Sequence, residues 1–73
     1  MVRKLAVGKQ YQHYKGKKYL VTGTARHSET LEELVVYECL YENDLGRTWV
    51  RPLSMFLEDV TVEGKTVPRF KEL

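Results

Sequence analysis

Three consecutive residues, His27, Ser28 and Glu29, have side chains of the types that make up hydrolytic catalytic triads. A triad works only when its groups form one hydrogen-bonded line, and folds achieve this by bringing them from separate parts of the chain. Neighbouring residues do not satisfy that geometry, because adjacent side chains of an extended segment point to opposite faces. The serine also lacks the Gly-x-Ser-x-Gly elbow that exposes a nucleophile. We therefore expect no catalytic residue here, and a small hydrolase or metal-assisted enzyme centred on His27 is the least favoured hypothesis.

The surrounding segment, ARHSET, is more simply interpreted as a loop that bonds to itself. Ser28 and Thr30 have short hydroxyl side chains, which bond nearby backbone groups in turns. We expect Glu29 to accept backbone amides and His27 to donate to a carbonyl group where the chain leaves a strand. Because ordered polar loops on rigid scaffolds often bind ligands, the loop also supplies candidate ligand-binding residues. These candidates are Arg26, His27, Ser28 and Glu29.

No pattern in the chain indicates a metal or cofactor site. The histidines and the cysteine (His13, His27 and Cys39) form neither a Cys-x-x-Cys motif nor a pair of histidines at ligand spacing. Cys39 lies in an apolar-rich segment and is interpreted as a small core residue. The five glycines are dispersed, so they do not form a phosphate-binding loop. A surface metal site at His27 and Glu29 is a weak alternative, and we expect neither a metal nor a cofactor.

The length and composition indicate one small domain. A chain of 73 residues buries only roughly 60% of the surface that it exposes when unfolded, so a ligand is expected on a shallow face or groove. The sequence contains no apolar run near the ~20 residues of a membrane span, no signal-peptide pattern and a single cysteine. We therefore expect a cytoplasmic protein with no membrane partner.

Charge is unevenly distributed along the chain, although the net charge is only +2. Residues 1–28 contain seven Lys or Arg residues and no acid, whereas residues 29–63 contain nine acids and two arginines. A basic first third could attract phosphate groups if it formed one face. Single-stranded nucleic-acid binding through the first predicted hairpin is therefore an alternative function. Its candidate residues are Lys15, Lys17, Lys18 and the stacking residue Tyr19, with Tyr14 beside them.

Short strand-like segments separated by glycine turns predict a mainly β fold. Lys15 and Gly16 suit a tight hairpin turn, because glycine adopts positive φ without a Cβ clash. Residues 19–25 are rich in β-branched and aromatic side chains, and Gly23 within them indicates a bulge or bend. Residues 34–41 are predicted as a strand. The residues just before them also fit a helical capping box, so a helical turn there stays open.

The second half of the chain completes the predicted fold. We expect a strand over residues 48–52, a helical turn over residues 52–56, and a last hairpin that turns at Glu63 and Gly64 with Pro68 on an edge. Together these elements predict a small antiparallel SH3-like barrel of five or six short strands with one short helical turn. The barrel domain would span residues 10–73, preceded by an N-terminal arm, residues 1–9, which could be flexible.

Strand alternation separates a predicted core from a predicted contact face. We expect the core to contain Val21, Val36, Leu40, Val50, Leu53, Phe56, Leu57 and Val60. Alternation then places the large polar-tipped side chains of the same segments on the outer face. These are Tyr37, Tyr41, Trp49 and Arg51. The alternative is that the aromatic residues close the ends of the barrel.

Trp or Tyr beside Arg can stack on a proline ring, a nucleobase or another ring system. The predicted ligand-binding face is therefore aromatic and arginine-bearing, with the Arg26–Glu29 loop at its rim. Its members are Tyr14, Tyr37, Trp49 and Arg51.

The chain also resembles a known bacterial family. The stretches YQHYKGKKYLVTGTARHSETLEELVVYECLY, WVRPLSMF and VPRF are similar, in this order and at this spacing, to the family catalogued as domain of unknown function 1653. The resemblance runs from Tyr11 to Phe70. It implies a small SH3-like β-barrel found as a stand-alone cytoplasmic protein. Because no activity is established for the family, the resemblance implies no catalytic role.

A non-enzymatic binding module is the leading hypothesis for function. A peptide or protein is the favoured partner, because the acidic middle third of the chain would repel phosphate, and nucleic acid is the alternative. Salt separates the two, since phosphate binding weakens steeply as salt rises. Self-association is a further hypothesis, because an exposed strand edge could pair two copies, and it gives a monomer or a weak homodimer.

Overall fold

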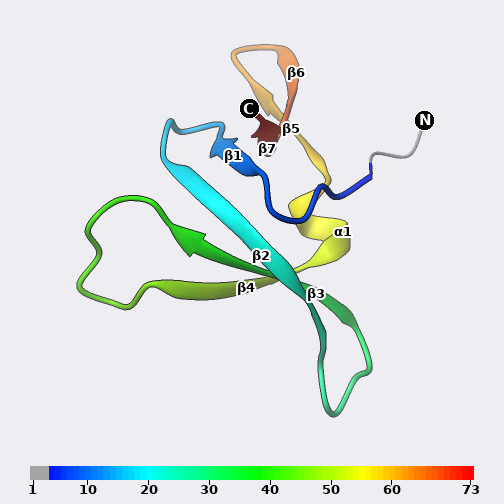
Figure 1. Cartoon of the computed structure of the whole chain (residues 1–73). Coiled ribbons are helices and arrows are strands. Elements are labelled where there is room, and N and C mark those ends of the chain that lie inside the picture. The colour runs from blue at the N-terminus through cyan, green and yellow to red at the C-terminus, as the bar shows by residue number, and fades with distance from the viewer. Residues whose placement is uncertain (1–3) are drawn as a thin grey trace.

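The computed structural model describes residues 4–73, which form seven strands and one helical turn (Figure 1). The predicted mainly β, antiparallel class with one short helical turn is confirmed. In chain order, the elements are β1 (Gln10–His13), β2 (Lys18–Arg26), β3 (Glu33–Cys39), β4 (Thr48–Pro52), α1 (Leu53–Phe56), β5 (Asp59–Val62), β6 (Lys65–Pro68) and β7 (Phe70–Glu72).

Five of these strands form one antiparallel sheet in the order β4-β3-β2-β1-β7. The strands β5 and β6 pair with each other in a separate two-stranded sheet. Figure 1 shows this hairpin beyond the β1 and β7 end of the molecule, with α1 leading to it from β4. The strands β4 and β7 are consequently the two edges of the larger sheet.

The tight turns lie where the sequence predicted them. The β5–β6 hairpin turns at Glu63 and Gly64, whose φ angles are 51° and 78°. Positive φ at both central positions is the type I′ geometry, whose twist matches that of the flanking strands. The turn between β1 and β2 contains Gly16 with a φ of 107°.

The predicted irregularity at Gly23 is a β-bulge. Val21 lies opposite Tyr37, whereas Gly23 lies opposite Val36, so β2 has one residue more than β3 across this stretch. Residues directly across a sheet share a face, so the bulge exchanges the inward and outward positions along β2.

The helical turn α1 follows directly from a proline, as predicted. Pro52 has φ −52° and ψ 136° and precedes the helix, where its missing N–H costs nothing. The turn is closed by the Leu57 N–H, which donates to the Leu53 carbonyl at 3.1 Å. It directs Phe56 into the core.

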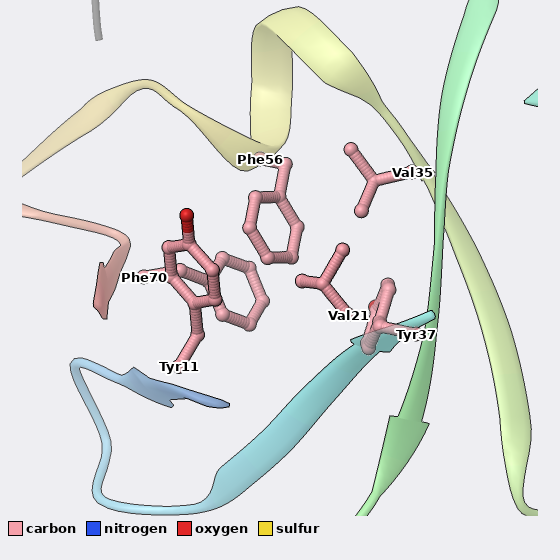
Figure 2. Close-up of a cluster of buried hydrophobic side chains, with 6 residues drawn as sticks. All are labelled: Tyr11, Val21, Val35, Tyr37, Phe56 and Phe70. Atoms are coloured by element: carbon pink, nitrogen blue, oxygen red, sulfur yellow. The ribbon is translucent and has the colours of Figure 1, made fainter. Parts of the chain in front are cut away.

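An aromatic cluster forms the centre of the core (Figure 2). The rings of Phe56 and Phe70 stack with their centroids 4.0 Å apart and their planes at 5°. Tyr11 meets Phe56 edge-on at 5.3 Å between centroids. The buried members of the cluster are Tyr11, Val21, Val35, Tyr37, Phe56 and Phe70.

The predicted direction of β3 and β4 is wrong. Val50 is 56% exposed and Leu40 is 45% exposed, and Val36 is only half-buried, whereas Tyr37 is 5% exposed and lies in the core. The reason is that β3 carries apolar side chains on both faces, so alternation did not decide which face is buried. The Tyr37 ring fills the core because it reaches both Phe56 and Phe70, at 5.5 and 5.8 Å between centroids.

The rest of the predicted core is closer to the structure. Val21 and Phe56 are buried as predicted, and Leu53 and Leu57 are partly buried against the cluster. Val60 is half-buried in the β5–β6 hairpin.

The residues just before β1 contact the sheet. Leu5 and Ala6 pack against the core cluster, and the Ala6 N–H donates to the Tyr11 hydroxyl at 2.9 Å. The Gly8 N–H donates to the Val21 carbonyl at 2.8 Å. The start of the predicted arm, residues 1–3, lies outside the described residues.

Candidate binding site on the inner face

The inner face of the large sheet, onto which Val21 and Val35 point, has two unequal halves. The helical turn α1 covers one half with Phe56. The other half is left half-buried and consists of aromatic and basic side chains from β1, β2, β4 and the segment after β3. We call it the open aromatic face, and its members are His13, Tyr19, Tyr41, Trp49 and Arg51.

Strand register brings these residues onto one side. Trp49 lies opposite Tyr37, and Arg51 lies opposite Val35. Because directly paired residues share a face, both must point inward like their buried partners. The Trp49 indole is further held by its Nε1–H, which donates to the Gly46 carbonyl at 3.2 Å.

Tyr19 is the centre of the aromatic packing on this face. Its ring meets Tyr37, Tyr41 and Phe70 edge-on at 5.3, 5.6 and 5.7 Å between centroids. Its hydroxyl and that of Tyr41 are hydrogen-bonded at 3.0 Å. Burial raises the pKa of Tyr19, and the hydrogen bond to Tyr41 raises it further, so the Tyr19 phenol stays neutral.

Arg51 places a cation within this aromatic surface. Its Nε–H donates to the Tyr37 hydroxyl at 3.4 Å, and its guanidinium carbon lies 5.5 Å from the centroid of the Phe70 ring. Within residues 4–73, Arg51 forms no ion pair with a carboxylate. Its charge is therefore available to an anionic group of a ligand.

His13 marks a positive environment beside Arg51. Its ring lies 4.5 Å from the Tyr14 ring and 4.9 Å from the Phe70 ring, between centroids. Burial lowers the pKa of His13, and the charges of Arg51, Arg69 and Lys15 lower it further. Since Nδ1 accepts the Lys15 N–H at 3.2 Å, the neutral ring carries its proton on Nε2.

Two open depressions flank the open aromatic face. One has a volume of about 450 Å³ and is lined by Gln12, His13, Tyr14, Gly16, Val67, Pro68 and Lys71. The other has a volume of about 500 Å³ and is lined by Cys39, Leu40, Tyr41, Glu42, Asn43 and Arg47. Both are shallow recesses of the kind that the chain length predicted.

Basic side chains of the first hairpin lie against this surface. The Lys17 ammonium lies 4.4 Å from the centroid of the Tyr41 ring, and the Lys15 ammonium lies 5.8 Å from that of Tyr14. Lys18 is exposed at the start of β2. The predicted nucleic-acid residues are thus adjacent, but Tyr19 is half-buried and its ring packs edge-on with three other rings.

The predicted peptide-binding residues are partly brought together. Tyr37, Trp49 and Arg51 share a face, but that face is the inner one and not the outer one that we predicted. Tyr37 contributes only its hydroxyl, which meets Arg51. Tyr14 is exposed beside His13 at the end of β1.

The loop from Arg26 to Glu29 lies apart from Tyr14. It follows β2, whereas the turn with Tyr14 precedes β2, so the two stand at opposite ends of this nine-residue strand (Figure 1). At ~3.3 Å per residue, they are separated by roughly 25–30 Å. From the sequence we expected this loop to form the rim of a face that includes Tyr14. The structure shows that it does not.

The loop bonds to itself, as predicted, but His27 plays the opposite part. Its Nδ1 accepts the N–H groups of Glu29 and Thr30 at 3.1 and 3.3 Å, whereas we expected the ring to donate. Within the described residues, these two backbone N–H groups have no carbonyl partner, so they require a side-chain acceptor, which His27 Nδ1 provides. The Thr30 hydroxyl oxygen accepts the Glu32 N–H at 3.2 Å, and Arg26 donates to the Leu31 carbonyl at 2.8 Å.

No catalytic arrangement forms around His27. In the described part of the chain, the Ser28 hydroxyl makes no hydrogen bond with the imidazole, whose Nδ1 is engaged with backbone amides. Among residues 4–73, no three side chains of His, Cys, Asp or Glu lie close enough together to hold a metal ion.

Sequence reasoning missed His13 and Phe70 as parts of the site. His13 lies two residues after Tyr11 on the same strand, and this parity was a signal that both point inward. Phe70 arrives through the pairing of β1 with β7, which local sequence does not reveal.

Comparison with known proteins gives one family. The model of the family described as protein of unknown function (DUF1653) matches residues 9–72. The chain belongs to this family. A crystal structure of a DUF1653 protein from Bordetella bronchiseptica superposes with a TM-score of 0.89 at 36% sequence identity, covering 100% of this chain and 92% of that chain. The resemblance stated from the sequence is thus confirmed.

Other comparisons add little to the DUF1653 assignment. No curated protein matches the chain. Within residues 4–73, the structure has no helix with the length and apolar character to cross a membrane.

Proposed function

We propose that this DUF1653 protein is a small, non-enzymatic SH3-like binding module that recognises a peptide segment of a protein partner through the open aromatic face. The observation that supports this most strongly is Arg51, a half-buried cation set among aromatic rings without a carboxylate partner in the described residues. A charge that is taken out of water without an ionic partner lowers stability. We infer that Arg51 is retained at this position for a ligand and not for stability.

The rings of the open aromatic face, with the exposed Tyr14 ring next to His13, suit a peptide. Trp49, Tyr41 and Tyr14 combine apolar area with a polar tip, as do the anchor residues of many recognition surfaces. The two flanking depressions offer pockets for side chains of an extended ligand. We propose that the protein works in the cytoplasm, without a cofactor, as a monomer or weak homodimer.

Single-stranded nucleic acid is the second candidate ligand. It is favoured by the position of Lys15 and Lys17 over the Tyr14 and Tyr41 rings, which places two cations beside Arg51. It is disfavoured because these lysines already cover ring faces that bases would stack on.

A backbone amide NMR titration tests the proposal. One arm adds a pool of proline-rich and aromatic peptides, and the other adds mixed single-stranded oligonucleotides at low and moderate salt. Peptide binding predicts shifts centred on Trp49 and Arg51, away from the first hairpin, and these shifts should vanish in Trp49→Ala. Salt-sensitive shifts around Lys15, Lys17 and Lys18 would replace peptide by nucleic acid.

A further inference from the structure

The strand β4, which carries Trp49 and Arg51, is an edge of the five-stranded sheet. The Cys39 N–H donates to the Arg47 carbonyl at 3.0 Å, just before β4 begins. In an antiparallel ladder, hydrogen-bonded pairs alternate with non-bonded ones. By this register, the backbone N–H and C=O groups of Trp49 and Arg51 form the hydrogen bonds with β3.

It follows that Thr48 and Val50 direct their backbone N–H and C=O groups away from the sheet. The pairing of β2 with β3 agrees with this. The Leu40 N–H donates to the Lys18 carbonyl at 3.0 Å, so in this part of the β3 segment the even-numbered residues form their backbone hydrogen bonds with β2. Natural edge strands are commonly protected by lysine, proline or a bulge. Residues 48–51 of β4 contain none of these, and Val50 is 56% exposed.

A strand added at this edge would extend both faces of the sheet. Its alternate side chains would lie beside Trp49 and Arg51 on the inner side, and the others beside Val50 on the outer side. Among described residues only the Nε–H of Arg51 is engaged, so its two amino groups can meet a carboxylate in a bidentate pair.

Charge favours an acidic peptide over a second copy paired through its own β4. The strand β4, with the sequence TWVRP, has no acidic residue, so a second β4 could not neutralise Arg51. Pro52 lacks an N–H, so it limits the pairing edge to Thr48 and Val50 for either partner. The neighbouring cations Lys15 and Arg69 make the surroundings of His13 positive, although Arg69 is also paired with Glu58 at 2.6 Å.

We propose that the ligand is an extended acidic peptide segment that pairs with the exposed edge of β4 and directs a carboxylate to Arg51. This inference rests on the proposed peptide-binding function and specifies its ligand. Main-chain pairing would supply affinity, and Arg51 with Trp49 would select the side chains.

The probes are capped seven-residue peptides of alternating valine and glutamate, with valine–glutamine and valine–lysine peptides as matched controls. Trp49 is the single tryptophan, so its fluorescence reports binding at the site. We expect the glutamate peptide to bind at least tenfold more tightly than the glutamine peptide. Arg51→Gln should remove this preference, whereas Lys65→Gln, on the distant exposed hairpin, should keep it.

N-methylation of alternate peptide residues tests the edge pairing without altering the protein. Methyl groups in one of the two alternating frames should weaken binding at least tenfold, because that frame faces β4. The other frame should bind as before.

The outcomes separate the two proposals. The acidic-strand inference is overturned if the glutamate and glutamine peptides bind equally, or if methylation has no effect in either frame. In both cases, a change in Trp49 fluorescence would still support peptide binding. No response of Trp49 to any of these peptides, together with an unresponsive NMR titration, overturns both. Sedimentation that shows a dimer dispersed by Val50→Pro would give the β4 edge to a second copy and overturn the inference.

Discussion

The two halves of the inner face share the strands β1 and β2, yet they have opposite properties. Where α1 covers the sheet, Phe56 and Phe70 stack and are buried (Figure 2). Where α1 ends, Trp49 and Arg51 occupy equivalent inward positions and remain half-exposed. One helical turn therefore decides which inward side chains become core and which stay half-exposed. The covered half provides stability, and we propose that the open half serves recognition.

Removing the covered half should have the largest effect. Phe56→Ala deletes the ring that contacts Tyr11, Tyr37 and Phe70, and truncations of this kind cost about 3–5 kcal/mol. In so small a domain we expect a largely unfolded protein in urea denaturation or thermal circular dichroism. Met55→Ala is the matched control on the same turn, where the side chain is 41% exposed. A Phe56→Ala protein as stable as that control would contradict the division of the face.

The β2–β3 loop provides a reference region outside both halves. His27→Ala leaves two backbone N–H groups without their acceptor, and we expect a loss of about 1 kcal/mol. His27→Asn should recover most of it, because an Asn side-chain oxygen also accepts amides in turns. Urea denaturation gives the free energy of unfolding, and amide exchange should change only in the loop. Altered resonances of Trp49 would show that the loop is coupled to the open aromatic face.

Acid should weaken the open half by a smaller amount. The pKa of His13 is lowered in the folded protein from its ordinary value of 6.5, so below that value the unfolded chain binds more protons. The stabilising contribution of neutral His13 is thus fully present above about pH 6.5, the ordinary pKa in the unfolded chain, and is lost as the pH falls from there through the lower pKa of the folded state. The difference in unfolding free energy between wild type and His13→Gln should shrink on going from pH 8 to pH 5. A difference that grows in acid would contradict this electrostatic picture.

Local chemistry predicted the fold better than it predicted the direction of its faces. The turn at Gly64, the bulge at Gly23 and the helical turn after Pro52 follow from restrictions on single residues, so they were visible in the sequence. The burial of Tyr37 was not, because Leu34 and Val36 on the other face of β3 are as apolar as a core requires. Only the arrival of Phe56 and Phe70 from distant segments decides between the two faces.

The candidate site was predictable to the same extent. Parity alone placed Trp49, Arg51 and Tyr37 on one side, and the register confirms it. The approach of His13 and Phe70 to Arg51 depends on the pairing of β1 with β7, which is long-range. The loop at His27 looked chemical because of its residue types, whereas its geometry is that of a hydrogen-bonded turn.

The most direct test of the account is the free energy of unfolding of Arg51→Leu by urea denaturation. If Arg51 is kept for a ligand, leucine exchanges one long hydrogen bond for apolar contact with Phe70. We expect stability unchanged within about 0.5 kcal/mol, or higher than that of the wild type, as is common at functional positions. A loss of more than about 1.5 kcal/mol would show that Arg51 is a structural part of the core, and the open aromatic face would lose its claim to be a binding surface.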